Sequence, residues 1–293
     1  MKQLGLYLIK SSTLSVRERM RMTAAAGFDY ICAASPAQLA ERGEDSFIAC
    51  AEREGLPIDN VHLTGSGTNK IWWPGSEGEE IIERYKREMD IAVGVGVRLG
   101  VVHVTWGHKN ITFSQLGLDR FNQLVDHAEK IGFTIGVENS VSIEHYTAVL
   151  EKFKNNPHVC FCFDTGHWNE FCRDTQIYDK YNSIMRITHI NDNDGVHDMH
   201  IIPFDGCTDF VKLAPSLRCM DRLTFEVSGV LRKPLDRPAD EMKECFSKLS
   251  RPADEFVKMY DSEYTAYEDV SYEQYLERLM TAAQRLRSMI ESA

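Results

Sequence analysis

Short apolar runs alternate with amphipathic stretches along most of this chain, and this alternation constrains the fold more than any other feature. Eight runs have the length and composition of buried strands: they cover residues 4–9, 29–33, 59–64, 99–105, 134–139, 158–164, 185–190 and 222–227. Several are continuously apolar, as parallel strands covered on both faces are. Amphipathic stretches such as 15–26, 79–93, 114–131 and 142–153 lie between them. The sequence therefore predicts an α/β fold, a (β/α)8 TIM barrel.

An open, doubly wound sheet is the competing arrangement, and it normally carries a glycine-rich turn after its first strand. No such turn follows residues 4–9, and the Gly-x-Gly at 94–96 precedes a strand instead of following one. The chain has 293 residues, and barrels of roughly 250 residues form one domain. We expect residues 1–293 to form a single barrel, in which 229–293 is a helical elaboration of the last βα unit.

The segment after the last predicted strand contains the sequence RPADE twice, at 237–241 and 251–255. Proline followed by acidic residues is typical of a helix start, so we predict helices there. Ser271 and Gln274 have the spacing of a capping box and predict an amphipathic helix to about residue 290. Arg232 and Lys233 are candidates for an anion contact in this segment.

Composition weighs against several classes of protein. The 44 acidic and 33 basic residues give a formal net charge of −11, which suits neither nucleic acid nor an anionic membrane. No stretch approaches the ~18 apolar residues of a membrane span, and the first residues lack the features of a secretory signal. The 8 cysteines include no C-x-x-C pair, which predicts free, buried thiols. We expect a cytoplasmic protein.

Imidazole and carboxylate groups fall at the carboxyl ends of successive predicted strands, where barrels place their catalytic residues. They are His62, His103, Glu138, Asp164, His189 and Glu226, with His167, Asp198 and His200 in the adjoining loops. In the run CFCFD, alternation puts Asp164 on the face of the two cysteines and opposite the two phenylalanines. If the phenylalanine face packs against the helices, Asp164 points into the barrel. Singly, each group could be an ordinary core or capping residue, but jointly they favour a metal site.

Four motifs around these residues, GVEN, FDTGHWN, HINDNDG and TFEVSG, resemble the xylose isomerase-like barrel superfamily, and specifically its sugar phosphate isomerase/epimerase branch. The resemblance reaches to about residue 228. It implies one catalytic divalent ion held by Glu138, Asp164, His189 and Glu226, with no organic cofactor. Oxygen and imidazole ligands suit Mn, Co, Mg or Zn. The resemblance also implies a homo-oligomer.

The same resemblance implies roles toward substrate. The two ligand glutamates, Glu138 and Glu226, would serve as an acid/base pair, and His167 would contact the sugar. Where epimerases of this branch often carry an arginine after the seventh strand, this chain has Asp192, Asn193 and Asp194. All four tryptophans follow predicted strand ends, where aromatic faces can pack against a sugar. The expected substrate-binding residues are His167, His200, His62, His103, Trp106 and Trp168.

A divalent ion chelated by a carbonyl and its neighbouring hydroxyl stabilises the enediolate formed when a carboxylate removes the adjacent proton. If a second carboxylate returns the proton on the opposite face, the carbon is inverted, and the reaction is an epimerisation. If one base serves both steps on one face, the outcome is isomerisation. We therefore expect an enzyme, a metal-dependent isomerase or epimerase acting on a small sugar or sugar phosphate.

Three other interpretations stay open. Apurinic endonucleases of the endonuclease-IV type, in the same superfamily, use three zinc ions and nine ligands. This chain could match that set by adding further metal ligands to the four above: His62, His103, His167, Asp198 and His200. The acidic charge and the NDNDG sequence favour the sugar branch. A keto-polyol dehydratase would share the first proton abstraction, and a sugar sensor would need no catalysis.

Overall fold

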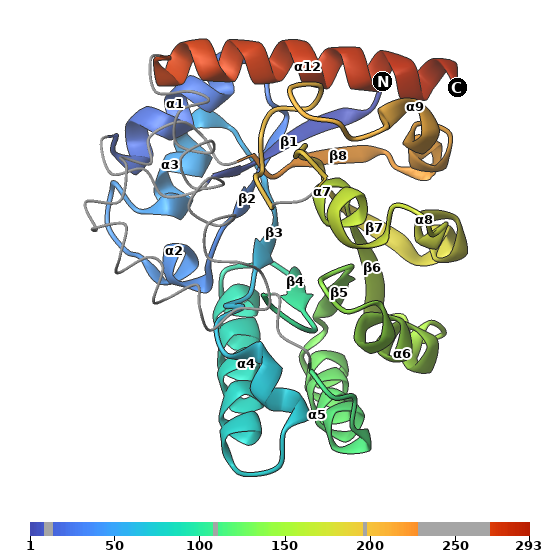
Figure 1. The fold of residues 1–293 in the computed structure, drawn as a ribbon. Helices are drawn as coiled ribbons and strands as arrows, with labels where there is room; N and C mark the ends of the chain where they lie inside the picture. The colour runs from blue at the N-terminus through green and yellow to red at the C-terminus, as the bar shows by residue number, and fades with distance from the viewer. Residues whose placement is uncertain (9–13, 108–110, 196–197, 228–269) are drawn as a thin grey trace, which may run out of the picture.

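The computed structural model describes residues 1–8, 14–107, 111–195, 198–227 and 270–293. Its centre is a sheet of eight parallel strands in the order β7-β6-β5-β4-β3-β2-β1-β8 (Figure 1). The strands are β1 (Gln3–Leu8), β2 (Tyr30–Ala33), β3 (Ile58–His62), β4 (Leu99–His103), β5 (Thr134–Glu138), β6 (Val159–Asp164), β7 (Met185–His189) and β8 (Arg222–Phe225). All eight predicted strands are present, with ends within two residues of those predicted.

The sheet closes on itself between β7 and β8, just beyond the end of β7. Ile190 donates its backbone N–H to the carbonyl of Thr224 at 2.8 Å, and Glu226 donates to the carbonyl of Ile190 at 3.1 Å. Ile190 and Phe225 form a parallel bridge there. The prediction of a (β/α)8 barrel is confirmed.

Helices surround this sheet, and the long ones lie close to where the sequence predicts them. The α-helices are α1 (Val16–Ala25), α2 (Pro36–Ala40), α3 (Phe47–Glu54), α4 (Glu77–Gly94), α5 (Gln115–Ile131), α6 (Ile143–Phe153), α7 (Thr165–His167), α8 (Ile177–Lys180), α9 (Phe210–Leu213) and α12 (Tyr272–Ser292). Short 3-10 turns are η1 (Thr68–Trp72), η3 (Asn182–Ile184) and η4 (Ser216–Cys219), and η2 (Trp168–Cys172) is a π-helical turn. Ser271 caps α12 with the predicted capping box. The RPADE copies, Arg232 and Lys233 lie outside the described residues.

Side-chain alternation separates two apolar layers, as the CFCFD run predicts. Cys160 and Cys162 face the barrel interior in a small cluster with Val101 and Ile187. Phe161 and Phe163 belong to the large core between sheet and helices. The 7 described cysteines are all free, and most are buried. The interior cluster is therefore separate from the large core, and the predicted inward direction of the cysteine face is confirmed.

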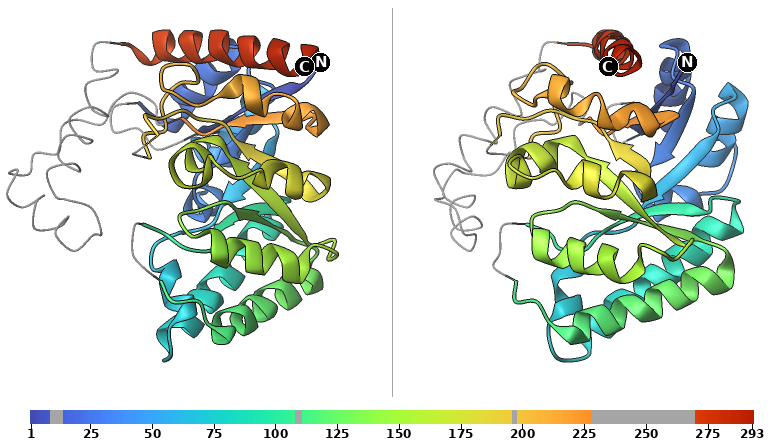
Figure 2. Two further views of the ribbon diagram at one scale, coloured as in Figure 1. Left: turned by 45° about the vertical axis from the view of Figure 1, so that its right-hand side comes forward. Right: turned by 90° about the vertical axis from the view of Figure 1, so that its right-hand side faces the viewer.

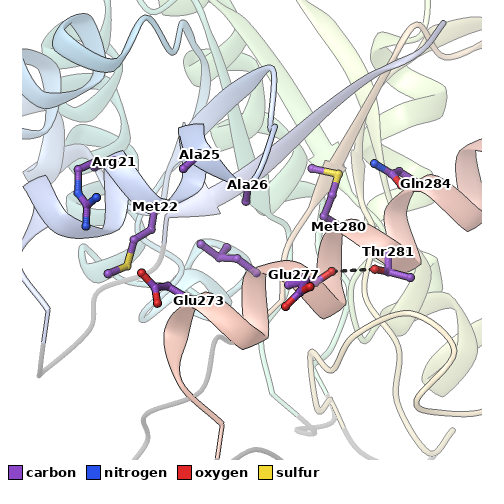
Figure 3. A pocket seen from close by; sticks show the side chains of 10 residues that line it. Arg21, Met22, Ala25, Ala26, Glu273, Glu277, Met280, Thr281 and Gln284 are labelled. Carbon is purple, nitrogen blue, oxygen red and sulfur yellow. Dashed lines mark hydrogen bonds between the residues drawn. The ribbon is translucent and has the colours of Figure 1, made fainter.

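The terminal helix α12 lies on the outside of the barrel, extending from α1 toward α9 (Figures 1 and 2). Between α1 and α12 is a surface groove, lined in part by Met22, Ala26 and Met280 (Figure 3). None of its lining residues belongs to the strand-end groups predicted from the sequence. Within the described part of the chain, no helix combines the length and apolar character needed to cross a membrane.

Candidate metal centre

The carboxyl ends of β5 to β8 bring four predicted ligands together. Glu138 ends β5, Asp164 ends β6, His189 ends β7 and Glu226 directly follows β8. One ligand atom from each of the four lies within 4.8 Å of the others. The side chains of Glu138, Asp164 and His189 have no exposed surface, and that of Glu226 is 14% exposed. The quartet is therefore a buried cluster that opens toward solvent beside Glu226.

Hydrogen bonds fix which nitrogen of His189 faces this cluster. The Tyr7 hydroxyl donates to Oδ1 of Asn60, whose amide nitrogen is oriented by Asp59 and Cys32. Tyr7 Oη lies 3.2 Å from His189 Nε2 and must accept there, because its proton is already donated. The remaining nitrogen, Nδ1, faces Glu138 Oε1 at 3.0 Å and Glu226 Oε2 at 2.9 Å. A nitrogen lone pair held against carboxylates needs a proton or a cation between them.

Asparagines hold Asp164 in its place beside His189. Asn139 exchanges two hydrogen bonds with the backbone of Asp164, at 2.7 and 2.9 Å. The amide of Asn191 donates to Asp164 Oδ2 at 2.8 Å, and the backbone N–H of His167 donates to Oδ1 at 2.6 Å. The Asn191 side chain lies so close to Gly166 that a Cβ added there would be 1.9 Å from its Oδ1. The glycine in the D-T-G-H sequence is thus required by packing.

The second oxygen of Glu138 faces a pair of histidines on the neighbouring strands. Oε2 lies 2.9 Å from His103 Nε2 and 3.4 Å from His62 Nε2, and these two nitrogens are 3.3 Å apart. His62 Nδ1 bonds the carbonyl of Leu63 at 2.8 Å, which directs its Nε2 lone pair to the cluster. Both histidines and Glu138 together could hold a cation.

A third group lies at the mouth of the barrel, between α7 and the loop after β7. Asp198 Oδ2 is 3.4 Å from His167 Nε2, and its Oδ1 is 3.0 Å from His200 Nε2. The other nitrogen of His200 bonds the carbonyl of Glu226 at 2.9 Å, and His167 Nδ1 is 3.2 Å from Glu138. The structure therefore brings all nine predicted residues into three adjoining groups that share Glu138 and Glu226 as neighbours.

Burial and mutual contact shift the acidities of these groups strongly. Burial would raise the pKa of Glu138, but His189 and His103 hold it well below its usual range. In Glu226 the same opposition, dominated by His189, leaves a pKa of about 2. Burial raises the pKa of Asp164 to about 6 despite the opposing charge of His167. Conversely, burial would lower the pKa of His189, yet the acidic groups around it raise it well above its usual value.

These shifts describe a site rich in negative charge that draws protons onto His167, His189 and His200, whose pKa values are all raised. A divalent cation would replace those protons, as metal binding does when ligands must deprotonate. The donor set is two glutamates, an aspartate and an imidazole nitrogen with a fixed tautomer. Glu138 Oε2 and His167 Nδ1 are buried, and their neighbours are other groups able to bind a cation: His103 Nε2 lies 2.9 Å from Glu138 Oε2, and Glu138 Oε1 lies 3.2 Å from His167 Nδ1. The residues therefore fit a divalent ion such as Mn, Co, Mg or Zn.

The predicted aromatic contacts are divided between surface and core. The Trp106 side chain lies after β4 and is 53% exposed, and its backbone N–H and carbonyl both bond the side chain of Asn69 at 2.8 Å. Trp168 is buried, packs edge-on against Tyr178 and donates to the carbonyl of Thr175 at 3.2 Å. Trp72 is buried as well and donates to the carbonyl of Val104. Of the three, Trp106 presents most surface to a ligand.

Tyr7, Asn60, Asn139 and Asn191 orient the ligands and were not predicted from the sequence. Tyr7 lies in the apolar run of β1, where its hydroxyl group is the only sign that it could orient another polar side chain. The asparagines follow or lie within strands, and an asparagine at a strand end could equally cap the next helix. The contacts through which they orient His189 and Asp164 join residues 25 to 182 positions apart in the chain, so no local pattern reveals them.

Fold and strand-end chemistry together define a TIM barrel with a polar carboxyl end, whose side chains could hold a cation. Its family is shown directly, because the sequence model of the xylose isomerase-like TIM barrel matches residues 20–246. The chain belongs to this family. A curated relative, the uncharacterized protein y4fM of Sinorhizobium fredii (strain NBRC 101917 / NGR234), is 25% identical over 183 residues, which are 56% of this chain and 55% of the relative. The chain thus matches about half the length of that relative.

Solved structures of similar shape share this barrel at low sequence identity. A D-allulose 3-epimerase from Methylomonas sp., in complex with D-allulose, gives a TM-score of 0.69 at 16% identity over 97% of this chain and 96% of that chain. A D-psicose 3-epimerase with D-tagatose from Clostridium cellulolyticum H10 gives 0.65 at 14% identity over 99% of both. A 3-keto-D-glucoside 4-epimerase from E. coli gives 0.62 at 17% identity, covering 89% and 100%. These likenesses establish the fold.

Proposed function

We propose that this protein is a divalent-metal-dependent isomerase or epimerase acting on a small sugar or sugar phosphate. The observation that carries the proposal is the surroundings of His189 Nδ1, which faces Glu138 and Glu226 at 3.0 and 2.9 Å and Asp164 at 3.9 Å. The Tyr7 contact keeps this nitrogen free of a proton in the neutral ring. The quartet Glu138, Asp164, His189 and Glu226 would hold one ion.

The ion, when bound, would supply Lewis acidity toward a carbonyl and an adjacent hydroxyl of the substrate. Glu138 and Glu226 are suited to move the proton of the neighbouring carbon. Both have lowered pKa values, so both begin ionised and able to accept a proton. They come from β5 and β8, which β6 and β7 separate. One glutamate, ionised, would take the proton on one face. The other would first gain a proton from solvent or a neighbouring imidazolium and would then return it to the carbon on the opposite face.

The histidines outside the quartet would bind the sugar in this proposal. His62, His103, His167 and His200 surround the two glutamates and present ring nitrogens at hydrogen-bonding distance from polar groups. A protonated imidazole nitrogen can donate to a sugar hydroxyl oxygen, and an unprotonated one can accept from a sugar hydroxyl. Trp106, at the rim, offers an aromatic face to the C–H side of a sugar.

The test combines metal content with turnover in heavy water. Protein purified without chelator is analysed for bound metal and is then incubated with ketoses and their phosphates in D2O. Ketohexoses come first, because the epimerases of similar fold hold D-allulose and D-tagatose. We expect about one ion per chain and a deuterium on the carbon that reacts. Metal-loaded protein that exchanges no carbon-bound proton in any sugar tested would refute the proposal.

Variants assign the roles of the two glutamates. Measured at metal concentrations high enough to restore binding, Glu138→Gln and Glu226→Gln should each lower turnover by about 10^2- to 10^4-fold, the usual contribution of acid/base catalysis. Glu88→Gln is the matched control, because Glu88 is also a buried carboxylate, bonded to the backbone of Thr64 at 3.0 Å and remote from the ligands. It should keep the activity of the native protein.

A second candidate function is a multinuclear hydrolase that cleaves phosphodiesters. The observation that favours it is the grouping of the other five residues, since His62 and His103 with Glu138, and His167 with Asp198 and His200, each form a possible cation site. Three adjoining ions could bind the attacking and leaving oxygens of a phosphodiester. The metal analysis separates the two functions: close to three zinc ions per chain, with nicking of abasic DNA, would favour the hydrolase.

A further inference from the structure

We propose that Asp192 is a positioning residue, which fixes the loop after β7 so that Asp198 and His200 reach the ligand cluster. This loop, called here the β7 loop, comprises residues 190–195 and 198–209. The part of the proposal that concerns activity rests on the proposed function, whereas the structural part does not. Asp192 belongs to the NDNDG sequence, in which only Asn191 has so far been given a role at the site.

The carboxylate of Asp192 is fully buried and accepts four hydrogen bonds, all from backbone N–H groups. Oδ1 accepts from Asn193 at 2.8 Å and Thr208 at 2.9 Å, and Oδ2 accepts from Phe204 at 2.8 Å and Gly206 at 3.0 Å. The backbone of Asp192 also exchanges two hydrogen bonds with Ile201, at 2.9 and 3.0 Å. One residue thus ties the outgoing and returning parts of the β7 loop together.

Both oxygens of Asp192 are therefore occupied by donors and are not free to hold a cation or a substrate. The carboxylate fits its surroundings closely, since a Cβ added to Gly206 would lie 2.5 Å from Oδ1. In a loop, buried backbone N–H groups lack the carbonyl partners that a helix or strand would provide. A buried carboxylate can accept from several of them and so hold the loop in one conformation. Asp192 acts on the site through the loop that it holds.

The β7 loop holds two of its residues in strained backbone conformations. His200 and Phe204 have positive φ, 50° and 77°, and they alone do so among the non-glycine residues described. Such conformations persist where the surroundings impose them. His200 lies directly before Ile201, bonded to the backbone of Asp192, and Phe204 is bonded to its carboxylate. These anchors hold His200 between the carbonyl of Glu226 and the carboxylate of Asp198.

The direct test is hydrogen exchange in Asp192→Asn, which replaces one acceptor oxygen by a donor facing N–H groups. Exchange at the amides of Phe204, Gly206 and Thr208 should become at least about 10-fold faster than in the native protein, as expected when protection by structure is lost. The control is Asp209→Asn, because Asp209 caps α9 through the N–H of Lys212 at 3.0 Å and touches none of these amides. Unchanged exchange in Asp192→Asn overturns the proposal, whatever reaction the protein catalyses.

A double-mutant cycle tests the link to the site. His200→Ala should lower kcat/KM by about 10-fold or more in the native background, and by less than about 3-fold once Asp192→Asn has released the loop. His103→Ala, at the end of β4, should lower kcat/KM by the same factor in both backgrounds. Additive effects of Asp192→Asn and His200→Ala would overturn the positioning role.

The two proposals can fail separately. If the native protein converts no sugar, the proposed function fails and the exchange experiment alone decides the role of Asp192. If Asp192→Asn does not fold, Gly206→Ala replaces it, because its Cβ would lie 2.5 Å from Asp192 Oδ1. The same Cβ would lie 2.3 Å from the carbonyl oxygen of Asn193, which accepts from the N–H of Cys207, so exchange at Cys207 is left out of the comparison. Faster exchange at Phe204 and Thr208 in Gly206→Ala supports the proposal, and native rates there overturn it.

Discussion

Replacing Tyr7 by phenylalanine isolates the contact that orients His189. The change removes one hydroxyl, which accepts from His189 Nε2 and donates to Asn60 Oδ1. Two buried polar atoms then lose their partner, and each such loss costs about 1–3 kcal/mol. The imidazole also loses the bond that keeps the proton off Nδ1. Because partners that orient a metal-binding imidazole contribute about 10- to 100-fold to affinity, metal binding should weaken by that factor.

Tyr30→Phe is the matched control for this variant. Tyr30 lies on the adjacent strand, is equally buried, and bonds the hydroxyl of Thr224 at 2.9 Å without touching a ligand. Both variants should lower the free energy of unfolding of the metal-free protein, as measured by denaturant titration. The loss should be about 1–3 kcal/mol for Tyr30→Phe, which removes one contact, and about 2–6 kcal/mol for Tyr7→Phe, which removes two. Only Tyr7→Phe should weaken the binding of Mn or Zn in calorimetric titration. Equal metal affinities in the two variants would refute the argument that Tyr7 sets the tautomer of His189.

Three further predictions concern the same cluster. Gly166→Ala would place a methyl carbon 1.9 Å from Asn191 Oδ1. It should lower the free energy of unfolding by about 1–3 kcal/mol, as overpacking does, and should weaken metal binding. Gly94→Ala is the control, because a methyl group there meets open space. Metal affinity should fall as the pH is lowered, because the raised pKa of His189 lets protons compete with the ion, and calorimetry in buffers of different ionisation enthalpy should detect proton release. If metal affinity does not change with pH, that reasoning is wrong. Chelation should lower Tm by roughly 5–10 °C relative to protein with metal at 100 times its Kd, which corresponds to ~2.7 kcal/mol, and Glu226→Gln should show little of this shift.

The barrel and its ligand groups could be predicted because both follow from local periodicity. Alternation along CFCFD places Asp164 inside, and parallel strands must end at one edge, where Glu138 and His189 then meet. Nothing local, however, reveals that Tyr7 meets His189, 182 residues later. Such contacts depend on barrel closure and on the register between strands.

The tryptophans show a different limit of sequence reasoning. Trp72, Trp106 and Trp168 all follow strand ends, but only Trp106 is largely exposed. An indole can fill a gap between helices as readily as it can cover a sugar, and sequence position alone does not decide which. The N–H groups of Trp72 and Trp168 find backbone carbonyls inside the protein, which makes their burial favourable.

The ligand quartet can form only once β8 has paired with β7 during folding. His189 lies at the end of β7 and Glu226 just after β8, so the quartet includes residues from both sides of the pairing that closes the sheet into a cylinder. A partly assembled chain in which β8 has not docked would present only three of the four ligands. A bound ion would therefore link β7 to β8 by binding His189 and Glu226 together. It would favour the closed barrel over folding intermediates in which these strands are not yet paired.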